Sequence, residues 1–253
     1  MADTKSGSDK SFHRRFLESK AGVFAIVTTL AISVGGIVEI VPMFTATAGP
    51  ERPDWVTPYT PLEVAGRDIY IREGCYVCHS QWVRPMRAEL IRYGEWSRAG
   101  EYRYDRPFLL GSRRIGPDLH RVGGKYPDAW HYEHMRDPRS ISPGSIMPPY
   151  PWLLEKTVDA DDIAASVRAL KRVGTPYTDQ EVANLPELLR IQSDAIVERL
   201  AGTGIQTQPD REIVALIAYL QRLGMDGRRA IDQGLTSPSV AASIDTVAAE
   251  GSQ

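Results

Sequence analysis

The longest uninterrupted apolar stretch of the chain lies near its start. Residues 21–41 contain a single charged side chain, Glu39. At 1.5 Å per residue, about 20 such residues match the roughly 30 Å hydrocarbon core of a bilayer. The preceding segment carries basic residues, namely Lys5, Lys10, Arg14, Arg15 and Lys20. Because basic flanks stay in the cytoplasm, the pattern predicts one transmembrane helix over 21–41, with residues 1–20 cytoplasmic.

Two other interpretations of this stretch are a buried core helix and a cleaved signal peptide. Ala46-Thr47-Ala48 supplies small residues at a cleavage-site spacing, so cleavage stays open. The apolar run is longer than a signal peptide needs, and we therefore favour an uncleaved anchor. Glu39 lies near the outer end of the span, where it could reach lipid headgroups or a neighbouring membrane subunit. Gly35-Gly36 would let such a neighbour approach closely.

Beyond the span, apolar residues recur at helical spacing, which predicts a mainly α domain. The proline-rich residues 42–60 are expected to form an extended linker, and residues 61–224 the domain itself. Residues 80–111 lack periodicity and are expected to form a long loop insertion. The small, polar residues 225–253 are expected to be a disordered tail. Helical spacing and capping signals predict helices over 61–73, 130–136, 159–173 and 210–223, with a further stretch opened by Thr178-Asp179-Gln180-Glu181 and restarted at Pro186.

The strongest chemical signal is Cys75-Tyr76-Val77-Cys78-His79, which contains both cysteines of the chain. The spacing C-x-x-C-H is that of a covalently attached c-type haem. Two thiols so spaced can form thioethers to one edge of the porphyrin, and the next residue can place its imidazole at the iron. A redox dithiol would not need His79, and a structural zinc site would need a second ligand pair. Since bacteria attach this haem outside the cytoplasm, the motif also implies export.

Composition excludes some partners. The chain has 253 residues, is 42% hydrophobic and 25% charged, and has a formal net charge of -2. These are ordinary globular values, and the near-zero charge argues against nucleic acid as a partner.

A haem held by His79 leaves the sixth iron position to be assigned. The candidates are His13, His120, His131, His134, Met86, Met135, Met147 and Met225. We favour Met147, because the proline-stiffened loop Ser145-Ile146-Met147-Pro148-Pro149 can hold a thioether against the opposite haem face. His120 is the next choice. With both axial positions filled, the iron has no open site, which predicts electron transfer without chemistry at this haem.

With these residues in place, the domain resembles a class I cytochrome c, in which a helix leads into C-x-x-C-H and a Gly-Pro-x-Leu segment follows. That resemblance implies that the carbonyl of Pro117 accepts the Nδ1 hydrogen of His79 and orients its ring.

Over residues 20–224 the chain resembles a narrower family, the monohaem subunits (subunit II) of cbb3-type cytochrome c oxidases. The resemblance also covers the long loop after the haem motif. It rests on the stretches Gly35–Pro42, Gly74–Gln81, Val83–Glu89, Arg92–Ser97, Tyr104–Phe108, Gly111–Leu119 and Ser145–Leu153.

The resemblance implies a place in the bacterial inner membrane, with the haem domain in the periplasm. The haem would take electrons from the dihaem c-type subunit or from a soluble cytochrome c. It would pass them to haem b of the catalytic haem–copper subunit, where oxygen is reduced to water. A calcium ion shared with the catalytic subunit would be held in part by Gly94, through its carbonyl, and by Ser97.

Two other functions compete with the oxidase subunit. One is a free membrane-anchored cytochrome c that shuttles electrons between respiratory complexes. The short, proline-rich linker and the aromatic loop region argue against a mobile tether. The other is an assembly scaffold with an incidental haem, which would gain nothing from Met147.

Overall fold

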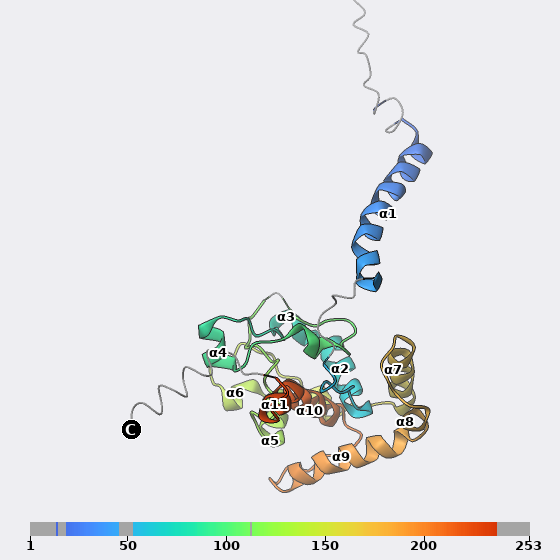
Figure 1. Cartoon of the computed structure of the whole chain (residues 1–253). Helices are drawn as coiled ribbons and strands as arrows, with labels where there is room; N and C mark the ends of the chain where they lie inside the picture. Colours follow the sequence, from blue (N-terminus) through green and yellow to red (C-terminus); the bar gives the residue numbers. More distant parts are fainter. Residues whose placement is uncertain (1–13, 15–18, 46–52, 112, 237–253) are drawn as a thin grey trace, which may run out of the picture. The chain divides into compact units, whose positions relative to one another are not determined.

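The computed structural model describes residues 14, 19–45, 53–111 and 113–236, and the chain divides into two compact units after Glu51 (Figure 1). In the first unit, α1 (Ala21–Thr45) includes the predicted membrane span. Residues Ala21–Val41 are long and apolar enough to cross a membrane, and no other helix in the described part of the chain is. The helix continues into the segment expected to be linker. Ala46-Thr47-Ala48 and His13 lie outside the described residues.

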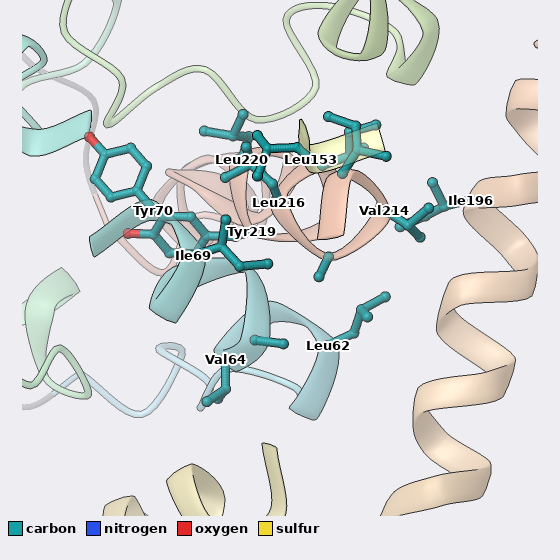
Figure 2. Close-up of a cluster of buried hydrophobic side chains, with 14 of the residues drawn as sticks. Leu62, Val64, Ile69, Tyr70, Leu153, Ile196, Val214, Leu216, Tyr219 and Leu220 are labelled. Atoms are coloured by element: carbon teal, nitrogen blue, oxygen red, sulfur yellow. The ribbon is translucent and has the colours of Figure 1, made fainter. Parts of the chain in front are cut away.

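The second unit is built around two helices, α2 (Pro61–Arg72) and α10 (Glu212–Arg222), which pack directly against each other. Their backbones approach closely at Gly66, where a Cβ atom would overlap the carbonyl of Ala215. Figure 2 shows the side chains that fill this contact, with Tyr70 of α2 beside Tyr219 of α10, ring centroids 5.4 Å apart. The buried residues that the figure labels are Leu62, Val64, Ile69, Tyr70, Leu153, Ile196, Val214, Leu216, Tyr219 and Leu220.

The predicted helix starts are confirmed by their capping bonds. At α2, Thr60 and Glu63 form a reciprocal capping box, which satisfies backbone N–H groups that have no partner within the helix. Thr178 and Glu181 do the same at α8 (Asp179–Ala183), and Asp159 caps α7 (Ala160–Arg172). The chain then restarts as α9 (Leu185–Ala201), with a proline in its first turn.

The remaining elements are short. The haem motif lies on α3 (Cys75–Cys78), and α5 (Asp128–Arg136) covers the helix predicted over 130–136. Among the described residues no strand forms, so the fold is mainly helical as predicted. The other short helices are α6 (Pro138–Ile141) and the 3₁₀ turn η3 (Pro151–Leu154).

Two segments contain more regular structure than expected. The long loop insertion contains a helix, α4 (Arg87–Tyr93), and a 3₁₀ turn, η2 (Ala99–Tyr102). The expected disordered tail begins instead with α11 (Met225–Asp232). This helix is anchored by Asp226, whose buried carboxylate accepts a hydrogen bond of 2.9 Å from the backbone N–H of Thr57 and pairs with Arg222. Residues 237–253 of the tail lie outside the described part.

Candidate functional site

A cavity of about 460 Å³ lies between α2, α3, α5 and α10 and the loops around Pro117 and Met147. This volume is in the range of pockets that bury a small molecule or cofactor. Its lining includes both cysteines of the haem motif and Met147.

Cys75 and Cys78 are unpaired thiols, and both line the cavity. The helix that carries them begins after Gly74, whose φ of 71° lies in the left-handed region that glycine adopts without strain. Burial, and next the charge of Glu73, raise the pKa of the Cys75 thiol to about 12. The surroundings of Cys75 therefore disfavour a thiolate.

His79 is oriented by the backbone. Its Nδ1 lies 2.8 Å from the carbonyl oxygen of Pro117, as the class I cytochrome c resemblance implies. Because a carbonyl can only accept, Nδ1 carries the hydrogen. Burial lowers the pKa of His79, which favours the neutral ring, although the bond to Pro117 partly opposes this. In that tautomer Nε2 has a free lone pair, the form in which histidine binds a metal.

Two residues that the sequence analysis did not single out hold this arrangement together. A Cβ atom at Gly116 would overlap the imidazole of His79, so only glycine leaves room for the ring. The buried carboxylate of Asp118 accepts hydrogen bonds from Ser80 Oγ at 2.6 Å and from the Trp82 N–H at 2.7 Å. It thus joins the segment after the motif to the segment that presents Pro117. The pattern Gly-Pro-Asp-Leu was the available signal, but it does not indicate which distant residues Gly116 and Asp118 contact.

Met147 is half-buried and lines the cavity. Its loop is held by a hydrogen bond of 2.8 Å from the N–H of Tyr150 to the carbonyl of Met135 on α5. Of the other methionines considered, Met135 also lines the cavity, whereas Met86 and Met225 do not.

The histidine candidates are distributed differently from the expectation. His120, the second choice, lies outside the cavity wall, with Nδ1 2.5 Å from Ser97 Oγ and 3.2 Å from Tyr102 Oη. These contacts hold its ring in a polar cluster, and His120 does not contribute to the cavity lining. His131 and His134 on α5 line the cavity instead.

The residues present fit a covalently attached haem. The cavity has the size of a cofactor pocket, two thiols at one edge and an imidazole with a free Nε2. The close contact between Gly116 and the imidazole holds that ring where a ligand is needed.

The positions expected to hold calcium are separate from this cavity. Gly94 is exposed, with φ of 103°, and Ser97 is buried. The Ser97 hydroxyl accepts a hydrogen bond of 2.8 Å from the Val83 N–H and contacts His120. Within the described part of the chain, no group of three or more His, Cys, Asp or Glu side chains could hold a metal ion.

Comparison with known proteins agrees with this geometry. Residues 14–226 match the family model described as "Cytochrome C oxidase, mono-heme subunit/FixO". A search of curated proteins finds no match. The family match covers most of the chain and includes the whole cavity. The chain therefore belongs to the FixO family and is a mono-haem subunit of a cbb3-type cytochrome c oxidase, in which it transfers electrons within the complex.

Proposed function

We propose that Cys75 and Cys78 hold the haem by thioethers and that His79 and Met147 ligate its iron. The observation that carries the proposal is the convergence of these four side chains on one cavity of about 460 Å³. Pro117 supports the set by accepting the Nδ1 hydrogen of His79.

In this arrangement the protein positions the cofactor and excludes other ligands. The bound haem supplies a one-electron couple. A thioether opposite an imidazole raises the reduction potential relative to two imidazoles. With Met147 and His79 as its ligands, the iron would have no open position for oxygen, and this chain would serve as a relay.

We place the relay between two partners. Electrons would arrive from the dihaem c-type subunit or a soluble cytochrome c, and leave for haem b of the catalytic haem–copper subunit. Exposed large apolar side chains in the segment after the haem motif support contact with a subunit, because aromatic residues and methionine are enriched at protein interfaces. They are Trp82, Met86, Ile91 and Phe108.

The membrane topology is also part of the proposal. Helix α1 would cross the inner membrane once, with the basic N-terminal segment in the cytoplasm and the haem domain in the periplasm. The C-x-x-C-H motif supports this orientation, since its haem is attached outside the cytoplasm.

Purification in mild detergent distinguishes a fixed subunit from the membrane-anchored shuttle. We expect the chain to co-purify with the catalytic haem–copper subunit and the dihaem subunit. A lone, stable 28.1 kDa species would overturn the fixed-subunit proposal and favour the shuttle.

The iron ligands are tested by spectroscopy of the full-length, haem-loaded chain. Met147→Ala should abolish the weak near-infrared absorption of a sulfur–iron bond while the haem stays covalently attached. Met86→Ala is the matched control, because Met86 is 51% exposed and does not line the cavity. Survival of the band in Met147→Ala would show that another group is the ligand.

We further propose a calcium ion shared with the catalytic subunit, to which this chain contributes through Gly94 and Ser97. Because the Ser97 hydroxyl is already engaged, that contribution would come from backbone carbonyls. Calcium measured by elemental analysis in the purified complex, and absent from the isolated chain, would support the site. Equal calcium content in both samples would contradict sharing.

A further inference from the structure

The haem cavity contains two imidazoles besides His79. His131 and His134 both lie on α5 and both line the cavity. The proposed relay uses neither of them. A buried histidine normally has a hydrogen-bond partner, so each calls for a physical explanation.

His134 lies on the helix that borders the Met147 loop. Its chain neighbour Met135 accepts the hydrogen bond from Tyr150 that ties this loop to α5. The ring of Trp130 stacks on the His134 imidazole, with centroids 4.5 Å apart and an interplanar angle of 14°. Burial lowers the pKa of His134, and the nearby imidazole of His79 lowers it further. Both histidines line the same cavity.

The hydrogen bonding of His134 is incomplete. Its Nδ1 is shielded from solvent and has no hydrogen-bond partner among the described atoms. The His120 ring, by contrast, has contacts to Ser97 and Tyr102 that would have to break before it could move. Movement of the stacked His134 ring would break no hydrogen bond at Nδ1. A neutral imidazole held in this way is well suited to bind a metal.

His131 is less suited to reach the iron. It is only 2% exposed and is fixed by edge contacts to Trp130 and Tyr126, with ring centroids at 5.3 Å and 6.2 Å. Its Nε2 also has no hydrogen-bond partner among the described atoms, but its ring is in edge contact with two aromatic neighbours and is almost fully buried.

We propose that His134 is a reserve axial ligand, which binds the haem iron when the Met147 thioether is displaced. This inference rests on the proposed ligation by Met147. In the exchange the iron–sulfur bond breaks and an iron–nitrogen bond forms through the imidazole lone pair, with no electron or proton transferred. Two imidazole ligands lower the reduction potential relative to His/Met ligation. Displacement of Met147 would therefore lower the potential of the relay while keeping its iron closed to oxygen.

The test uses the full-length, haem-loaded chain in detergent and reads the spin state and carbon monoxide binding. Met147→Ala should lose the near-infrared sulfur band yet remain low-spin, and its reduced form should not bind carbon monoxide. Met147→Ala combined with His134→Phe should become high-spin and bind carbon monoxide. Phenylalanine keeps an aromatic ring to stack on Trp130. The matched control, Met147→Ala with His131→Phe, should remain low-spin.

Two results would overturn the inference: a high-spin Met147→Ala single variant, or a low-spin Met147→Ala/His134→Phe double variant. Added imidazole should return the double variant to low-spin, which shows that its cavity is intact. If Met147→Ala loses its haem, Met147→Leu is used in the same series. Absence of the sulfur band from the unmodified chain would instead refute Met147 ligation itself, so the two failures are distinguishable.

Discussion

His120 and His134 illustrate two different uses of a shielded imidazole in one domain. His120 is 5% exposed and belongs to a polar cluster formed by Ser97, Glu101, Tyr102, His120 and Arg121. Its Nδ1 contacts two hydroxyl groups. His134 lies in the wall of the haem cavity, and its Nδ1 has no partner among the described atoms.

The charged side chains of the polar cluster have hydrogen-bond partners. Arg121 donates to both carboxylate oxygens of Glu101, and also to the carbonyls of Glu95 and Trp96 at 2.8 and 2.9 Å. Its charge and hydrogen bonds outweigh the burial that opposes ionisation, so the pKa of Glu101 is lowered. Buried polar groups are costly only when unpaired. The cluster can therefore stabilise the fold, but it cannot bind a ligand without losing bonds.

In the haem cavity, only some of the imidazole nitrogens have hydrogen-bond partners. The ring of His79 is oriented by the hydrogen bond from its Nδ1 to the carbonyl of Pro117. On α5, His131 Nε2 and His134 Nδ1 have no hydrogen-bond partner among the described atoms. Burial alone therefore does not identify a histidine that is free to bind a ligand. The hydrogen-bond partners of each nitrogen do.

The largest effect that would sharpen this contrast is expected from Gly116→Ala. The added methyl group would overlap the imidazole of His79 and displace it from Pro117. We expect most of the haem-loaded, low-spin protein to be lost, as measured by covalent haem content and the absorption spectrum. Gly144→Ala is the control, because Gly144 also lines the cavity but a Cβ there meets no atom within 4 Å. Equal haem content in the two variants would contradict the role of Gly116.

In the polar cluster, Glu101→Gln should lower the free energy of unfolding by about 3–5 kcal/mol, because it leaves the buried Arg121 charge without its partner. The two side chains are only 5% and 9% exposed. The haem spectrum should not change. Urea unfolding measures the loss, and Glu187→Gln, which removes an exposed partner of Arg190, should cause no measurable change. Equal stability of the two variants would show that the cluster is not internally stabilising.

Asp118 connects the two regions, because its carboxylate accepts from Ser80 and Trp82 and also from the His120 N–H at 2.9 Å. Asp118→Asn replaces an acceptor oxygen with a donor that faces other donors, which should cost about 1–3 kcal/mol of unfolding free energy. Thermal unfolding of the haem-loaded chain would measure it. A variant as stable as the parent would show that water or rearrangement replaces these bonds.

A pH dependence of stability is expected from His120. Burial, and next the charge of Arg121, lower its pKa from 6.5 to about 3. Between these values the unfolded chain binds a proton that the folded chain does not, so this contribution is complete above pH 6.5 and is lost on acidification. The slope should be up to about 1.4 kcal/mol per pH unit.

Urea unfolding at a series of pH values between 6.5 and 4.5 would detect this contribution. His120→Gln removes the titrating group, so its stability should fall less steeply on acidification than that of the parent chain. Parallel curves for the two proteins would contradict the buried, neutral state of His120.

Features that depend only on neighbouring residues could be predicted from the sequence. The haem motif, the membrane span, the capping boxes and the apolar stripes of α2, α7 and α10 are each encoded within one continuous stretch. Local spacing and side-chain chemistry are enough to recognise them. The same local information, through the proline-stiffened loop, also singled out Met147 as the candidate thioether.

Only the tertiary structure decided which residues far apart in the chain meet. It placed His134 in the cavity wall and His120 in a separate cluster, although the two residues lie close together in the sequence. It likewise gave Gly116 and Asp118 their roles at the haem motif, and folded the expected tail into α11 through the contact between Thr57 and Asp226. The physical reason is that burial and hydrogen-bond partners come from segments brought together by folding, and local spacing carries no record of them.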